Sequence, residues 1–279
     1  MENDNFRDYA NADDKVVNVY KLNHQYQTVD FAKSQIEKYC TKFGQIAWSD
    51  QPATRRQGKC QMSIWDAINR LDSIIDESDP DTDSAQIVHA FQTAEALRKR
   101  FPDKDWLHLV GLIHDLGKVL LLPEFGSQKQ WSVVGDTFPL GCQFSDKIVY
   151  PHFFEQNPDY YNPLYKTKLG IYQENCGLNN VLFSFGHDEY LYKVLVHNNC
   201  LIPEIGLRII RFHSFYPWHK SGAYEYLEDG SDIELKKWCQ IFSQCDLYTK
   251  DGNKPDIEKL KPYYYGLVNK YFPNKILDW

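Results

Sequence analysis

One strongly apolar stretch with a polar interruption, DWLHLVGLIHDLGKVLL, occupies residues 105–121. Apolar residues surround the pair His114-Asp115 on nearly all sides of a helix, which predicts that this helix is central to the fold. Burying a carboxylate without a partner costs on the order of several kcal/mol, so the aspartate is expected to meet a cation or a metal ion. The pair therefore indicates either a metal site or a core histidine beside an aspartate that is salt-bridged elsewhere.

Two glycines, Gly111 and Gly117, bracket this pair. Glycine in the interior of a helix costs about 1 kcal/mol relative to alanine, so two of them in a central helix need a reason. Close approach by another part of the molecule is such a reason. We therefore predict tight packing against both positions.

The patterns on either side of this stretch predict an all-α fold with one helical core. Residues 1–30 are interpreted as an extended N-terminal arm or lid, and residues 31–279 as a single catalytic domain. Residues 122–180 hold much of the Gly, Pro, Asn and Gln and are expected to form long ordered loops over the helices. Helical spacing of apolar residues predicts helices at about 29–43, 61–76, from a cap at Ser84 to the break at Phe101, 105–121, 185–197, 204–215 and 232–248.

The composition limits the class of protein. The 279 residues can bury a full core, and the net charge of −7 argues against binding to a nucleic-acid backbone. No apolar run approaches the roughly 18 residues of a membrane span, and the acidic N-terminus does not resemble a secretory signal. The seven cysteines are scattered without a CxxC pair, which favours a reducing compartment, most simply the cytoplasm.

Further residues of metal-binding type occur on other predicted helices in apolar surroundings. Each of them alone is more simply a structural residue. Packing does not readily explain, however, why five helices, the central one included, each carry one or two residues of this type. With the central pair they exceed what one catalytic metal needs, and they suit two metals that share a carboxylate. The absence of cysteine among these candidate ligands favours iron or manganese over structural zinc. The further residues are His89, His187, His213 and Asp246.

Two lysines lie at helical spacing from these groups. Lys118 follows Asp115 by three positions, and Lys250 follows Asp246 by four, so each is expected on the same helix face as a proposed ligand. A cation beside a metal centre can hold a substrate oxygen or stabilise developing negative charge. The alternative for either residue is an ordinary surface lysine.

A lone histidine, a His-Asp pair and a distant aspartate on helices resemble the HD-domain superfamily of metal-dependent enzymes. Longer strings are similar to the myo-inositol oxygenase family over nearly the whole chain. The resemblance implies an HD-domain-like helical core for residues 31–279. The similar strings include residues 76–81, 89–95, 114–118, 133–139, 186–192, 211–219 and 246–250.

The resemblance also implies a non-haem di-iron centre without an organic cofactor. Asp115 would bridge the two irons and act with Lys118 in catalysis. One iron would be held by His187 and His213, and the other by His89, His114 and Asp246. The residues that bind substrate would be Arg7, Asp76, Glu77, Ser78, Lys118, Gly135, Asp136, His213 and Ser214.

Members of this family cleave myo-inositol with O2 to give D-glucuronate, the first step of inositol catabolism, at a mixed-valent Fe(II)/Fe(III) centre. The resemblance therefore implies myo-inositol and O2 as substrates, and we expect a cytoplasmic monomer without nucleic-acid or membrane partners. An HD-type phosphohydrolase is the alternative, but it would need clustered cations for phosphate. Here only Lys118, Lys250 and Arg7 are candidates, beside acidic loops. A binding module with a degenerate site would have lost ligands, and none is lost.

Overall fold

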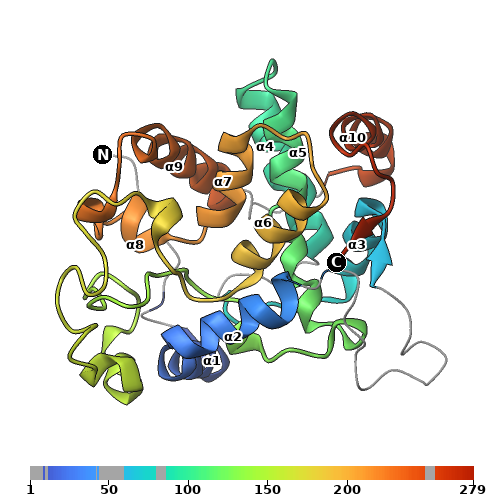
Figure 1. Ribbon diagram of the computed structural model, residues 1–279. Helices are drawn as coiled ribbons and strands as arrows, with labels where there is room; N and C mark the ends of the chain where they lie inside the picture. Colours follow the sequence, from blue (N-terminus) through green and yellow to red (C-terminus); the bar gives the residue numbers. More distant parts are fainter. Residues whose placement is uncertain (1–8, 10–11, 42, 44–59, 80–85, 249–254) are drawn as a thin grey trace.

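The computed structural model describes residues 9, 12–41, 43, 60–79, 86–248 and 255–279, and these are mostly helical (Figure 1). The all-α prediction is confirmed. In the described ranges, β-structure is limited to the antiparallel pair β1 (Gln61–Met62) and β2 (Leu277–Asp278) and one isolated bridge. The α-helices are α1 (Asp14–Tyr26), α2 (Val29–Cys40), α3 (Ile64–Arg70), α4 (Gln86–Arg100), α5 (Asp105–Ile113), α6 (His187–His197), α7 (Glu204–Phe212), α8 (Tyr216–His219), α9 (Asp232–Tyr248) and α10 (Ile257–Tyr271).

Helix α5 lies at the centre of the molecule, as its sequence predicts. Residues 107–113 are all buried, and α4, α7 and α10 pack against this helix. Helix α9 contacts both α4 and α7, and α6 contacts α7. Figure 1 shows α4 and α5 side by side, with α6 and α7 next to them. The helices predicted to carry metal ligands therefore form one connected group.

The chain turns at the His-Asp pair. Helix α5 ends at Ile113, and a 3-10 segment, Leu116–Leu121, follows Asp115. The prediction of one continuous helix over residues 105–121 is therefore wrong in its second half. Adjacent side chains on a regular helix diverge by about 100°. The turn relaxes that constraint, because Asp115 leaves the helical conformation with φ −95° and ψ 2°.

The predicted close approach at both glycines is confirmed. A Cβ atom at Gly111 would lie 2.9 Å from the Cα of Ala94 in α4. A Cβ atom at Gly117 would lie 2.0 Å from the backbone oxygen of His187, the first residue of α6. The two glycines thus let the helices that carry His89 and His187 come close to the turn.

The interpretation of residues 1–30 as an extended arm is wrong for residues 14–26, which form α1. The side chain of Asp13 caps this helix by accepting from two backbone N–H groups. Helix α1 buries one face, which includes Val16, Val19 and Tyr20, and packs against the loop region. Arg7 and the predicted cap Ser84 lie outside the described residues.

The end of the chain also holds a helix that the sequence did not reveal. Residues 257–271 form α10, although Pro262 lies inside it. Its buried face of Tyr264, Leu267 and Val268 follows helical spacing. Pro262 is the sixth residue of α10, past the first turn, so the carbonyl of Glu258 lacks its usual intrahelical donor there.

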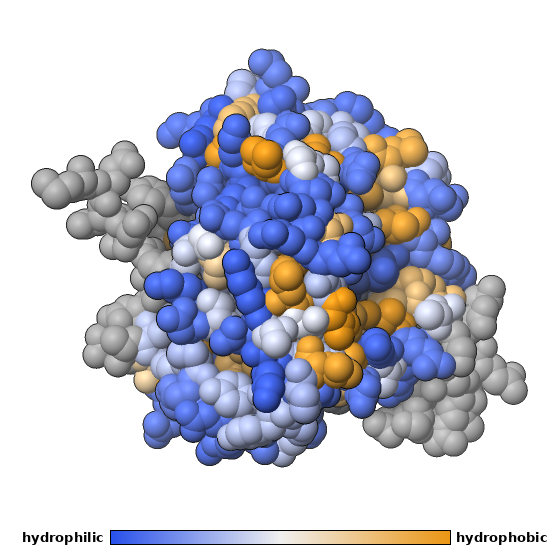
Figure 2. All heavy atoms as spheres, turned by 60° about the vertical axis from the view of Figure 1, so that its left-hand side comes forward, coloured by the Kyte–Doolittle hydropathy of each residue, from blue (hydrophilic) through white to orange (hydrophobic). Residues whose placement is uncertain are grey.

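Residues 122–180 form loops and short 3-10 turns, as predicted. Phe138, Phe154 and Leu178 anchor them by inserting fully buried side chains into the core. Figure 2 shows a face of the molecule that is mostly hydrophilic, with hydrophobic residues in separate groups. No helix in the described part of the chain has the length and hydrophobicity needed to cross a membrane.

Candidate metal centre

Side chains from α4, α6, α9 and the turns after α5 and α7 converge at one buried point. Ligand atoms of His89, His114 and Asp115 lie within 4.8 Å of one another, and so do those of Asp115, His187 and His213. Asp246 completes the cluster, since its Oδ1 lies 2.9 Å from His89 Nε2 and 3.2 Å from His114 Nε2. We call His89, His114 and Asp246 the first half-site, and His187 and His213 the second half-site.

Asp115 faces both half-sites with different oxygen atoms. Its Oδ2 lies 3.3 Å from Nε2 of His114 in the first half-site. Its Oδ1 lies 3.2 Å from Nε2 of His187 and 3.8 Å from Nε2 of His213 in the second. One carboxylate is therefore placed to reach two neighbouring cations.

The outer ring nitrogens of three histidines contact backbone carbonyls. His114 Nδ1 lies 2.8 Å from the oxygen of Gly111, and His213 Nδ1 lies 2.8 Å from that of Ile210. His187 Nδ1 lies 2.8 Å from the oxygen of Val133. Because a carbonyl can only accept, Nδ1 must carry the proton. In the neutral form of each ring, the Nε2 lone pair then faces the cluster, where it can bind a metal in place of a proton.

The charges of the cluster also favour the binding of cations. Burial alone would raise the pKa of Asp115 and of Asp246, but the charge of His114 outweighs it and holds both pKa values well below their usual range. Burial alone would lower the pKa of His114, but the two carboxylates raise it to about 10. Concentrated carboxylate charge and directed imidazole nitrogens are the donor set of a transition-metal site. The residues present fit metal ions.

Lys118 is buried beside the cluster and is no surface lysine. Its Nζ donates to Asp115 Oδ2 at 2.8 Å and to Gln86 Oε1 at 3.0 Å. It also pairs with Asp76 Oδ2 at 2.8 Å. Burial would lower the pKa of Lys118, but the two carboxylates outweigh it and raise that pKa. Lys250, the other lysine singled out above, lies outside the described residues.

A small cavity of about 20 Å³ adjoins the ligands and Lys118. Of the residues expected to bind substrate, it is also lined by Asp76, Ser78, Gly135 and Ser214, and Gly135 adopts a positive φ of 102°. Asp136 is buried next to Gly135 and accepts a hydrogen bond from Tyr20, while Glu77 is exposed and does not line the cavity.

Some lining residues were missed by the sequence analysis. Gln86 lies one helix turn before His89, so helical spacing could have indicated it. Asp79 belongs to the string of residues 76–81 noted above. No pattern in the sequence indicated Tyr216, which comes from α8.

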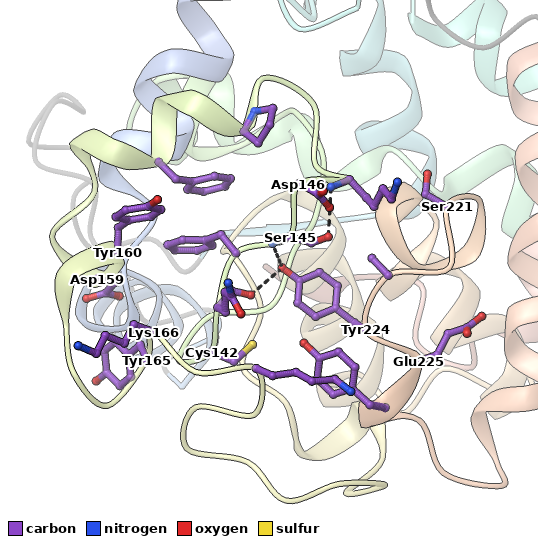
Figure 3. A pocket seen from close by; sticks show the side chains of 18 of the residues that line it. Cys142, Ser145, Asp146, Asp159, Tyr160, Tyr165, Lys166, Ser221, Tyr224 and Glu225 are labelled. Atoms are coloured by element: carbon purple, nitrogen blue, oxygen red, sulfur yellow. Dashed lines mark hydrogen bonds between the residues drawn. The ribbon is translucent and has the colours of Figure 1, made fainter.

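A second cavity of about 1110 Å³ lies between the loop over residues 142–168 and the loop over residues 221–226 (Figure 3). Tyr224 connects the two loops, since its hydroxyl accepts from the backbone N–H of Ser145 at 2.7 Å. Among the residues that the structure describes, none lines both cavities, and no group of metal-binding side chains lies at the second one. The candidate metal ligands therefore lie at the first cavity.

Comparisons with known proteins extend over nearly the whole chain. Residues 13–279 match the family model described as Myo-inositol oxygenase. The chain is 50% identical to inositol oxygenase 1 of Arabidopsis thaliana, over 98% of this chain and 84% of that protein. It is 49% identical to the inositol oxygenase of Danio rerio, over 98% and 93%. It is 47% identical to the inositol oxygenase of Dictyostelium discoideum, over 100% and 91%.

Proposed function

The chain belongs to the myo-inositol oxygenase family, and we propose that two irons at the buried cluster carry out its reaction. It is an oxygenase whose substrates are myo-inositol and O2. The proposed reaction opens the inositol ring to give D-glucuronate without an organic cofactor. The observation that carries the two-iron proposal is the position of Asp115, which presents Oδ2 to the first half-site and Oδ1 to the second.

The two half-sites would have different tasks. Together with Asp115, the first half-site offers four ligands and the second offers three. The iron with fewer protein ligands keeps more positions for other molecules, so we assign the substrate to the second half-site. When bound, two irons in the mixed-valent Fe(II)/Fe(III) state would polarise substrate oxygens and exchange electrons with O2.

Lys118 and Asp76 would recognise the polyol. The ammonium donates to substrate oxygens, and the carboxylate accepts from substrate hydroxyls, so an analogue without matching hydroxyls would leave buried groups unpaired. A cavity of about 20 Å³ holds a water-sized group, so the ring must displace contacts around Lys118. Further binding roles are proposed for Arg7, Glu77, Ser78, Gly135, Asp136, His213 and Ser214.

The acidic surroundings argue against a phosphohydrolase. Among described residues, Lys118 is the one lysine or arginine that lines the cavity, and Asp76 and Asp79 line it as well. A phosphate group would be repelled by these carboxylates, and it would lack the several cations that usually neutralise it.

The test is to load the protein with Fe(II) and supply myo-inositol and O2. We expect two irons per chain, an EPR signal of a coupled pair after partial oxidation, and equal amounts of O2 consumed and uronate formed. A single iron per chain would refute the two-iron proposal. Phosphate release from nucleotides without uronate formation would favour the phosphohydrolase.

We further propose a cytoplasmic monomer that needs no nucleic-acid or membrane partner. The seven cysteines form no disulfides with one another in the described structure, which agrees with a reducing compartment. Light scattering of the purified protein tests the oligomeric state, and a mass of about 33 kDa is expected from the 32.8 kDa chain.

A further inference from the structure

Asp188 lies directly behind a ligand of the second half-site. It follows His187 at the start of α6 and is buried, with 2% of its surface exposed. Its Oδ1 lies 3.0 Å from His187 Nδ1, on the side of the ring that faces away from the cluster. Its Oδ2 accepts a hydrogen bond from Thr137 Oγ1 at 2.9 Å, which fixes the carboxylate in place.

The other histidines with described outer contacts have no such neighbour. The outer nitrogens of His114 and His213 contact neutral carbonyls, whereas that of His187 contacts both the Val133 carbonyl and a carboxylate. The Nδ1–H of His187 points to Val133, and Asp188 Oδ1 has no hydrogen bond of its own in the described structure. Asp188 therefore acts on the ring mainly through its charge.

The charge of Asp188 is compensated by the second half-site. An iron held by His187 would place positive charge on the opposite side of the ring from Asp188. A buried charge of this kind persists only where positive charge lies nearby.

The two half-sites differ in the negative charge that they supply. The first half-site contains Asp246 and shares Asp115, while the second shares Asp115 and otherwise holds neutral imidazoles. A second carboxylate ligand there would add charge but would occupy a coordination position that the substrate needs. Asp188 adds the charge from behind His187 and leaves that position free.

On the basis of the proposed di-iron centre, we propose that Asp188, held by Thr137, is a positioning residue that favours the oxidised state of the iron at the second half-site. A carboxylate next to the outer nitrogen of a metal-bound imidazole makes that imidazole a stronger electron donor. A stronger donor stabilises Fe(III) relative to Fe(II).

The experiment measures the reduction potential of the iron-loaded protein by redox titration followed by EPR. Asp188→Asn keeps the shape and removes the charge, so it should keep two irons and shift the Fe(III)/Fe(II) equilibrium at least tenfold toward Fe(II). For a one-electron couple, tenfold corresponds to about 59 mV. Asp188→Glu retains the charge and should restore much of the wild-type potential.

Thr137→Val provides a milder variant, because it keeps Asp188 and removes only the hydrogen bond that fixes it. It should shift the potential in the same direction by a smaller amount. If Asp188→Asn loses the second iron, Thr137→Val decides: a shifted potential supports the proposal, and an unchanged one overturns it.

The outcomes separate this inference from the proposed function. Wild-type protein with one iron would refute the di-iron centre itself. Wild-type protein with two irons, together with an Asp188→Asn variant of unchanged potential and two irons, would overturn only the role of Asp188.

Discussion

The two half-sites are built from the same residue types but differ in number and placement. The first half-site combines two histidines with its own carboxylate, Asp246, while the second has two histidines and no carboxylate ligand of its own. In the second, His187 is the first residue of α6 and His213 follows the last residue of α7. His114 of the first half-site likewise follows the last residue of α5, so the missing carboxylate is what distinguishes the second half-site. On the proposed assignment, the absence of a second carboxylate ligand at the second half-site provides room for the substrate.

The largest effect is expected where the half-sites meet. Asp115→Ala removes the carboxylate that faces both, so we expect less than one iron per chain and no detectable O2 uptake with myo-inositol. Iron analysis and an oxygen electrode measure the two quantities. Asp72→Ala, which removes an exposed aspartate, is the control and should behave like wild type. Two tightly held irons in Asp115→Ala would contradict the bridging role.

Removing one histidine from each half-site should separate their tasks. His213→Ala leaves the first half-site complete, so about one iron per chain should remain while myo-inositol binding is lost. His89→Ala should also retain about one iron, at the second half-site, and still bind myo-inositol. Iron analysis and calorimetric titration with myo-inositol give both readouts. Equal loss of substrate binding in the two variants would show that the assignment of substrate to the second half-site is wrong.

Much of this site could be predicted from the sequence because its ligands interrupt apolar helix faces. Burying the charge of Asp115 beside His114 in an apolar helix costs free energy unless a cation compensates it, and this cost predicts the location of the metal centre. The two glycines predict that other helices come close to the pair, and the contacts of Gly111 and Gly117 confirm this prediction. The turn after Ile113 was not predicted, because the apolar spacing continues through it and the contact of Gly117 with His187 in α6 is distant in the sequence.

Helix α1 was missed for a related reason. Its inner face contains the polar residues Asn23 and His24 beside Val16, Val19 and Tyr20, so the apolar pattern ends early. These polar groups are buried only because distant loops supply their partners: His24 Nε2 contacts the backbone oxygen of Val149 at 2.7 Å. A role that depends on such partners, like that of Asp188 behind His187, cannot be derived from local spacing.

The glycines offer a smaller perturbation that still distinguishes the half-sites. Gly117→Ala forces a Cβ against the backbone of His187, so α6 must shift, and the stability should fall by about 1–3 kcal/mol. The new methyl group of Gly111→Ala would contact Ala94 and the flexible end of Leu97 in α4. The higher helix propensity of alanine offsets about 1 kcal/mol of the resulting loss of stability. Urea unfolding should therefore show the larger loss for Gly117→Ala.

Iron analysis of the same two variants extends this comparison. Gly117→Ala should weaken iron binding at the second half-site, and Gly111→Ala should affect the first. A Gly117→Ala protein with wild-type stability and iron content would show that the contact with His187 has no role in placing that ligand.

The smallest effect is expected from single hydroxyl groups, and it separates the half-sites by substrate binding alone. Ser214 lines the cavity next to His213, so Ser214→Ala should remove one hydrogen bond to myo-inositol and raise KM about 2- to 10-fold with little change in kcat. Thr93→Val is the matched variant, because Thr93 Oγ1 contacts Asp246 at 3.4 Å in the first half-site. Its KM should stay at the wild-type value, since the proposed substrate site is the second half-site. Steady-state kinetics with myo-inositol decide, and a larger KM change in Thr93→Val than in Ser214→Ala would reverse the assignment of the two half-sites.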